Sequence, residues 1–160
     1  MAISRMFRGV AATATAIFLS ASAGAPLVDY PVGYRQWTHV TSGVNGDVHG
    51  PYAGMYHIYA NARAMRGYRT GHFPDGALIV FDLHETRSAD EVVQPGGRKF
   101  IDVMHKDARL FRSTGGWGYE EFAGGDPGQR RISPEAAAKR CHNCHEAKQS
   151  ADYVISRFRD

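Results

Sequence analysis

The chain has 160 residues, of which 43% are hydrophobic and 22% charged, so it is long enough to bury the core of one globular domain. Aromatic residues make up 11% of the chain and no run of about twenty apolar residues occurs, which excludes a disordered chain and a membrane-spanning helix. The formal net charge is only +3, and the basic stretch over residues 130–140 has no aromatic stacking pattern, so nucleic acid is not an expected partner.

Residues 1–23 have the organisation of an export signal. Arg5 and Arg8 form a short basic segment, residues 10–19 are small or apolar and uncharged, and residues 21–23 are Ala-Ser-Ala, which a signal peptidase accepts. An uncleaved membrane anchor is the alternative, but the apolar run is nearer about ten residues than the roughly twenty that a span requires. We therefore expect a signal peptide over residues 1–23, one mature domain over residues 24–160, and a periplasmic location.

The first part of the mature chain predicts a helix, a strand and a second helix. Tyr34, Trp37 and Val40 recur at helical spacing, which favours a short amphipathic helix. Residues 55–60 are rich in aromatic and β-branched side chains and predict a strand. Asn61 is a good N-cap for a helix that Gly67 or Gly71 can end; this helix covers residues 62–68.

The middle of the chain predicts strands separated by turns. A Pro-Asp-Gly turn at residues 74–76 precedes an apolar run over 77–83, which predicts a strand buried on both faces. A charged, glycine-containing segment over residues 90–97 predicts an exposed loop leading to an antiparallel strand over 98–104. The elements expected next are one or two helical turns over residues 106–112, a strand over 117–122 and a loop over 124–128.

The C-terminal part begins with a strong helix signal. Ser133 can cap a helix, Pro134 suits its first position, and Glu135 favours the positive end of the helix dipole. Because the 18 glycines and the strand-like runs do not suit a helical bundle, the chain predicts an α+β fold whose C-terminal helix continues into the cysteine motif.

Both cysteines lie in Cys141-His142-Asn143-Cys144-His145, which has the CxxCH spacing of haem c attachment. Two thiols three positions apart can each add to one haem vinyl group, and the adjacent imidazole then binds iron. A thioredoxin-like redox pair and a structural zinc site are the alternatives, but neither a βαβ pattern nor a second ligand pair accompanies the motif. We predict one covalently attached haem c, with Cys141 and Cys144 as tethers, His145 as the axial iron ligand and His142 as a solvated spacer.

The position of the motif bears on the other axial ligand. CxxCH lies near the C-terminus, so the chain does not have the order of small electron-transfer cytochromes, in which CxxCH is near the start and a ligating Met lies far downstream. Met65 and Met104 fall in a predicted helix and a predicted strand, where core packing is the expected role. We predict an iron without a strong sixth protein ligand.

Several separate motifs along the mature chain occur in the order of a known family. They are Gly33-Tyr34-Arg35-Gln36-Trp37, Thr70-Gly71-His72-Phe73-Pro74-Asp75-Gly76, Lys106-Asp107 with Phe111 and Gly116-Trp117, and the terminal CxxCH with Asp152-Tyr153-Val154. Together they resemble the cytochrome P460 and cytochrome c′-beta family. The resemblance implies a mainly antiparallel β-sheet with peripheral helices, a homodimer and one five-coordinate c-type haem.

One position separates two chemistries in that family. Members resembling cytochrome P460 carry a Lys in the strand after the Asp-Gly turn, cross-linked to the haem edge and accompanying hydroxylamine oxidation. This sequence has Phe81 there, which has no nucleophilic nitrogen. The departure resembles the cytochrome c′-beta branch, in which aromatic residues crowd the open haem face and the protein binds nitric oxide or carbon monoxide. From its own apolar strand alone, Phe81 is an ordinary core residue; only the resemblance makes it a distal cap.

Two further sets of residues are candidates for the haem pocket. His57 can carry a proton near neutral pH, although a single strand histidine is more often an ordinary polar side chain. Haem propionates need cationic or hydrogen-bonding partners when they are shielded. The candidates for that role are Arg35, Arg69, Arg98 and Lys99.

Two functions remain open at this point. The first is a periplasmic haem protein that binds nitric oxide or carbon monoxide at an open iron. The second is an oxidoreductase that acts on hydroxylamine or a related nitrogen compound and passes electrons to a partner cytochrome, with a Tyr or His cross-link in place of the missing Lys. A plain electron shuttle ranks third, because an open iron site reorganises too much for fast electron transfer.

Overall fold

The structure is a computed structural model that describes residues 26–46 and 50–159, and within them it forms a five-stranded antiparallel sheet in the order β1-β2-β3-β4-β5. The strands are β1 (Thr38–Asn45), β2 (Gly54–Ala60), β3 (Leu78–Ala89), β4 (Val92–Lys106) and β5 (Trp117–Ala123). The helices are α1 (Ala62–Thr70) and α2 (Pro134–Glu146), with the 3-10 turns η1 (Tyr34–Gln36), η2 (Arg112–Thr114) and η3 (Gln149–Ala151). This confirms the α+β prediction; the expected signal peptide, residues 1–23, lies outside the described residues.

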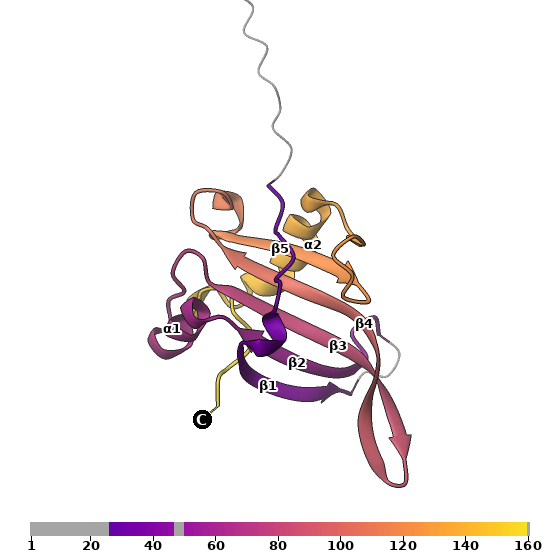
Figure 1. Ribbon diagram of the computed structural model, residues 1–160. Helices are drawn as coiled ribbons and strands as arrows, with labels where there is room; N and C mark the ends of the chain where they lie inside the picture. Colours follow the sequence, from indigo (N-terminus) through magenta and orange to yellow (C-terminus); the bar gives the residue numbers. More distant parts are fainter. Residues whose placement is uncertain (1–25, 47–49, 160) are drawn as a thin grey trace, which may run out of the picture.

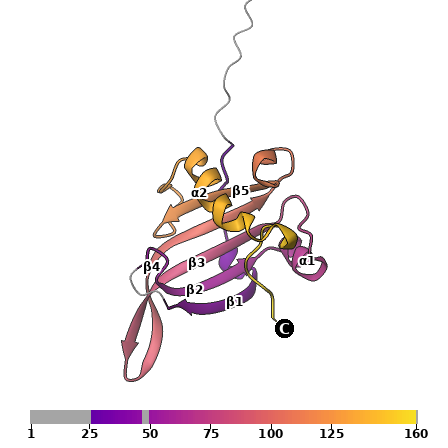
Figure 2. The same ribbon diagram turned by 180° about the vertical axis from the view of Figure 1, so that it is seen from behind.

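Different parts of the chain cover the two faces of the sheet. The segment before β1 crosses one face (Figure 1), whereas α2 and the C-terminal segment cross the other (Figure 2). Strand alternation sends Ile79 into the core beneath α2 and Val80 into the core beneath the N-terminal segment. The first half of β3 is therefore buried on both faces, as its continuous apolar run predicts.

The predicted helix caps are confirmed. The Asn61 side chain accepts a hydrogen bond from the backbone N–H of Ala64 at 2.8 Å, and α1 ends at Gly71, which has a left-handed φ of 82°. Ser133 accepts from the backbone N–H of Ala136 at 3.2 Å and starts α2. No helix among the described residues is both long and apolar enough to cross a membrane.

The predicted amphipathic helix over Tyr34, Trp37 and Val40 is wrong. Residues 34–36 make only a 3-10 turn, and β1 begins at Thr38. Tyr34 packs in the core beneath the N-terminal segment and Val40 in the core beneath α2. The helical spacing therefore does not mark one buried face, because these residues contact opposite faces of the sheet.

The predicted loop over residues 90–97 is also wrong. β3 and β4 continue past the sheet as a two-stranded arm (Figure 1), joined at Asp90 and Glu91, whose φ values are 51° and 64°. The arm pairs Ala89 with Val92 and Thr86 with Pro95, so this polar segment has cross-strand backbone partners. The segment after β4 forms a turn, with its 3-10 helix at Arg112–Thr114 rather than over residues 106–112.

Candidate functional site

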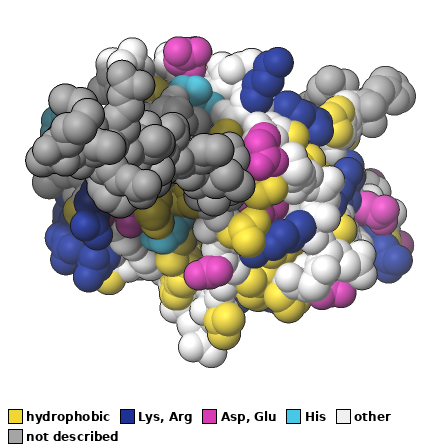
Figure 3. Space-filling model, turned by 90° about the horizontal axis from the view of Figure 1, so that it is seen from above, with side chains coloured by type: hydrophobic (Ala, Val, Ile, Leu, Met, Phe, Trp, Pro, Cys, Tyr) yellow, Lys and Arg dark blue, Asp and Glu magenta, His cyan; other side chains and the backbone are white. Residues whose placement is uncertain are grey.

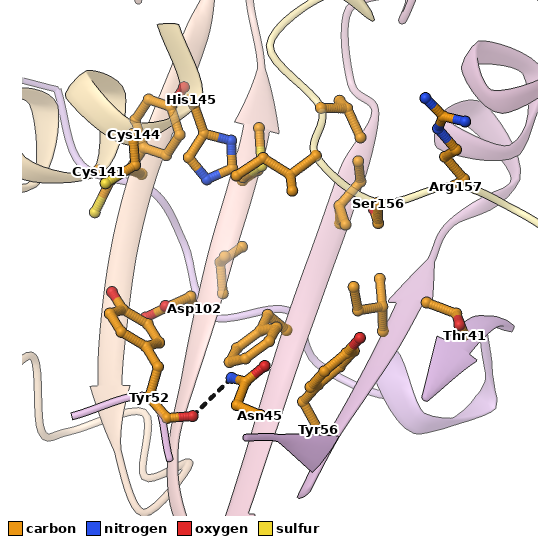
Figure 4. Close-up of a pocket in the computed structure, with 18 of the residues that line it drawn as sticks. Thr41, Asn45, Tyr52, Tyr56, Asp102, Cys141, Cys144, His145, Ser156 and Arg157 are labelled. Carbon is orange, nitrogen blue, oxygen red and sulfur yellow. Dashed lines mark hydrogen bonds between the residues drawn. The ribbon is translucent and has the colours of Figure 1, made fainter. Parts of the chain in front are cut away.

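A cavity of about 590 Å³ lies between the sheet and the layer formed by α2 and the C-terminal segment (Figure 4). Its volume is in the range of sites that enclose a cofactor-sized ligand. Side chains from all five described strands contribute to its lining, most of them apolar or aromatic. The lining residues used below are Tyr52, Tyr56, Phe81, Asp102, Tyr119, Arg140, Cys141, Cys144, His145, Arg157 and Arg159.

Helix α2 presents the CxxCH motif to this cavity. Cys141 is half-buried and Cys144 exposed, both are free thiols, and both line the cavity together with His145. Positions three and four apart lie on one side of a helix, so both cysteines and His145 are on the side of α2 that borders the cavity (Figure 4). Burial, with the neighbouring carboxyls of Asp102 and Glu121, raises the pKa of the Cys141 thiol to about 12.

A hydrogen bond fixes the orientation of the His145 ring. Its Nδ1 lies 2.7 Å from the backbone carbonyl oxygen of Tyr153, which can only accept, so Nδ1 carries the proton. The lone pair then resides on Nε2, the nitrogen that a metal requires. Burial lowers the pKa of His145 and favours this neutral form. The imidazole is thus held in the tautomer that could bind a metal, with its ring lining the cavity.

His142 is not the solvated spacer that the sequence predicts. It is half-buried, with its ring centroid 5.3 Å from that of Tyr153, and its Nδ1 is buried without a hydrogen-bond partner among the described residues. Its packing against Tyr153 depends on the C-terminal segment folding back over α2. Met104 is buried as predicted, and it also lines the cavity.

An aromatic wall forms the side of the cavity across from His145 (Figure 4). The Phe81 ring stacks on Tyr56 with a centroid distance of 5.2 Å and an interplanar angle of 23°. Tyr52 meets the Phe81 ring edge-on at 6.2 Å. Tyr52 is further held by a 2.7 Å hydrogen bond from the Asn45 side chain to its carbonyl. Phe81 therefore lies in the cavity wall and is not enclosed in the core.

Asp102 adds an acidic group to that wall, and the sequence analysis did not single it out. It is paired in register with Phe81 on the neighbouring strand, and its Oδ1 is buried without a hydrogen-bond partner among the described residues. Burial and the adjacent Glu121 carboxyl raise its pKa well above the usual 3.8, so the neutral acid is favoured. An Asp within an otherwise apolar strand is the sequence signal that points to it.

His57 lies away from the cavity. It occupies the opposite face of the sheet, where its Nδ1 is 2.7 Å from the Ser42 hydroxyl and its ring 5.9 Å from that of His84. Burial is the main cause that lowers its pKa. The structure therefore does not bring His57 together with Phe81 and His145.

The four candidate propionate partners also lie outside the described cavity lining. Arg98 donates to the Asp82 carboxylate at 2.6 Å on the face opposite the cavity, and Lys99 donates to the backbone carbonyl of Ala53 at 2.8 Å. The arginines that do line the cavity come from α2 and the C-terminal segment. They are Arg140, Arg157 and Arg159.

The donor set fits a haem better than a zinc ion. Within the described residues, no group of three or more His, Cys, Asp or Glu side chains has the arrangement to hold a metal ion. An apolar cavity with two thiols, a buried imidazole and arginines at its border has instead the requirements of a tetrapyrrole with anionic propionates.

The comparison with protein families agrees with this chemistry. The family model described as Cytochrome P460 matches residues 31–156. That range includes all described strands, both helices and the CxxCH motif. A search of curated proteins finds no match.

Proposed function

The chain belongs to the cytochrome P460 family, and from its cavity we propose that it is a periplasmic c-type haem protein that binds small uncharged ligands such as nitric oxide or carbon monoxide. Family membership implies a haem cofactor. The observation that carries the finer proposal is the aromatic wall around Phe81. Phe81 stands where members resembling cytochrome P460 carry the Lys that is cross-linked to the haem.

The residues of α2 have separate roles in this proposal. Cys141 and Cys144 would tether one haem c through thioether bonds, and the Nε2 of His145 would bind its iron. When bound, the haem would supply the iron to which the small ligand binds. Arg140, Arg157 and Arg159 supply the cationic groups that the propionates need.

The wall opposite His145 selects the ligand. Phe81 and Tyr56 present ring faces and apolar edges, which repel water and anions but admit a neutral diatomic molecule. The Phe81 ring offers a ligand neither a hydrogen bond nor a counter-charge. Uncharged gases are the class that this wall favours.

Asp102 favours a second candidate function. A neutral carboxylic acid that lines the cavity can give a proton to a bound nitrogen compound, and the carboxylate that this leaves can take a proton back. On this alternative the protein is an oxidoreductase for hydroxylamine or a related compound and passes electrons to a partner cytochrome. The face seen in Figure 3 has interspersed basic and acidic side chains, so docking of that partner would rely on local complementarity.

The absorption spectrum of the purified holoprotein tests the proposal. A ferrous Soret band at the ordinary position for five-coordinate haem c, which shifts on addition of nitric oxide, is expected. A strongly red-shifted ferrous band would indicate a modified macrocycle and overturn the proposal, and hydroxylamine turnover would then be measured. Phe81→Lys should move the spectrum towards the cross-linked type, whereas a lysine placed on the opposite face by Val80→Lys should not.

Further measurements on the purified protein and on one variant test signal-peptide cleavage, covalent haem attachment, the homodimer and the role of His145. The intact mass should equal residues 24–160 plus one haem, as cleavage of the signal peptide and covalent attachment require. Sedimentation should give a homodimer. His145→Ala should lose axial ligation while the thioether bonds to Cys141 and Cys144 persist.

A further inference from the structure

The segment after α2 carries the atom that orients His145. Asp152 and Tyr153 follow η3, and both have left-handed φ values, 50° and 64°. Residues with side chains rarely adopt this region, and two in succession persist only where the surroundings impose them. The resulting reversal of the chain turns the Tyr153 carbonyl towards α2, where it accepts the 2.7 Å hydrogen bond from His145.

Three parts of the fold hold Asp152 in that conformation. Its Oδ1 is 2.6 Å from the Lys106 ammonium at the end of β4, and its Oδ2 accepts from the backbone N–H of Phe73 at 2.8 Å. Its own carbonyl accepts from the Trp117 indole N–H at 2.8 Å. Every oxygen of Asp152 is therefore bound to a different segment of the chain.

The surroundings of these contacts are close-packed. Lys106 also donates to the Gly115 carbonyl at 3.0 Å, and its Nζ lies 5.1 Å from the centre of the Trp117 ring. Gly115 leaves space for the Tyr153 ring, since a Cβ there would lie 2.2 Å from Tyr153 Cε2. Lys106 and Asp152 are nearly enclosed, with side-chain exposures of 11% and 13%, so their ion pair is poorly screened by solvent.

We propose that Asp152 is a positioning residue for the axial ligand: by holding the left-handed Asp152–Tyr153 pair against Lys106 and Phe73, it keeps the Tyr153 carbonyl on Nδ1 of His145. This rests on the proposed function, in which His145 binds haem iron. Asp152 acts on the imidazole only through the backbone of Tyr153.

The hydrogen bond affects the iron through the basicity of the imidazole. An acceptor on Nδ1 increases electron donation from Nε2 and orients the ring, and loss of such a partner typically changes metal affinity about 10–100-fold. A more basic imidazole stabilises ferric iron more than ferrous iron. Loss of the Asp152 contacts should therefore weaken the iron–histidine bond and raise the midpoint potential.

Three variants of the holoprotein test this inference. Asp152→Ala removes both carboxylate contacts, Asp152→Asn keeps an acceptor for the Phe73 N–H but removes the charge, and Lys106→Met removes the ion-pair partner. The matched control is Asp82→Asn, which neutralises a buried carboxylate bound to Arg98 on the opposite face of the sheet. The readouts are the iron–histidine stretching band of the reduced protein and the midpoint potential.

We expect the stretching band to broaden and move to lower frequency in Asp152→Ala. The ferrous-to-ferric ratio at a fixed potential should rise about tenfold, which is 59 mV for a one-electron couple. Asp152→Asn and Lys106→Met should show smaller shifts of the same sign, and Asp82→Asn none. If Asp152→Ala does not bind haem, the band and the potential of Asp152→Asn and Lys106→Met test the inference instead.

Two results would overturn the inference. One is an unchanged band and potential in the Asp152 and Lys106 variants that fold, even if they unfold at lower temperature. The other is an equal shift in Asp82→Asn, which would make the effect a general loss of stability. Failure of the proposed function is distinguishable, because it appears in the wild-type protein as an absence of gas binding, whereas the potentials of the variants can still be compared.

Discussion

Removal of the Phe81 ring should open the haem cavity to anions. The ring makes two aromatic contacts, one stacked on Tyr56 at 5.2 Å and one edge-on with Tyr52 at 6.2 Å. Each such pair contributes about 0.5–1.5 kcal/mol beyond its buried area, so loss of both in Phe81→Ala should remove about 1–3 kcal/mol of the free energy of unfolding in addition to what the buried area of the ring contributes. Fully buried phenylalanines lose roughly 3–5 kcal/mol of the free energy of unfolding when replaced by alanine. Because Phe81 already borders a cavity, its total loss should fall below the top of that range.

The assay is azide binding to the ferric holoprotein, followed by its absorption spectrum, with guanidinium unfolding measured in parallel. Without the ring, water and anions reach the iron, and the azide affinity should rise at least about tenfold, or about 1.4 kcal/mol. Phe81→Leu should give a smaller rise. Phe122→Leu is the matched control, since Phe122 is buried on the opposite face and contacts Tyr30 at 5.1 Å.

An azide affinity that stays at the wild-type value in Phe81→Ala, while the free energy of unfolding falls, would show that Phe81 only fills space. A comparable rise in Phe122→Leu would show that azide binding reports a loosened fold. Either result would refute the assignment of Phe81 as the group that excludes anions.

Three other substitutions test the packing and the charges. Gly67→Ala should lower the midpoint of thermal unfolding, because the new Cβ would lie 2.2 Å from the Phe73 ring. Such overpacking costs about 1–3 kcal/mol, which is more than the roughly 1 kcal/mol gained in helix propensity. A higher midpoint would contradict this. Asp82→Ala leaves Arg98 without its carboxylate and should lower the free energy of unfolding by about 3–5 kcal/mol in denaturant titrations. Folding raises the pKa of Asp102 above its usual value of 3.8. The contribution of this carboxyl to the free energy of unfolding is therefore fully present below pH 3.8, and it is lost as the pH rises through the pKa of the folded protein. Asp102→Asn should therefore gain stability relative to wild type as the pH rises above 3.8, and a constant difference in unfolding midpoint across that range would count against the buried neutral acid.

The sequence alone determined the elements that depend on neighbouring residues. The caps at Asn61 and Ser133 bond to amides three positions away, and the apolar run at the start of β3 marks a buried strand wherever it occurs. The CxxCH motif is local in the same sense, because one helix face brings both thiols and His145 together. The predictions of the caps and of the buried strand are confirmed because the interactions behind them span only a few residues.

Only the tertiary structure decided which side chains meet across the sheet. The helical spacing of Tyr34 and Val40 was misleading because they pack on opposite faces, and the polar segment 90–97 became strand because β3 and β4 supply each other's backbone partners. Asp102 reaches the cavity through its register with Phe81 on the adjacent strand.

The site depends on the same long-range contacts. His57 is close in sequence to Tyr56 in the cavity wall, yet alternation along β2 places it on the other face. The orientation of His145 requires Asp152 to contact Lys106 and Phe73, which are far from it in the chain. The sequence predicts which residues could bind a haem. The tertiary structure decides how those side chains are held, because that depends on contacts between distant segments that no local pattern records.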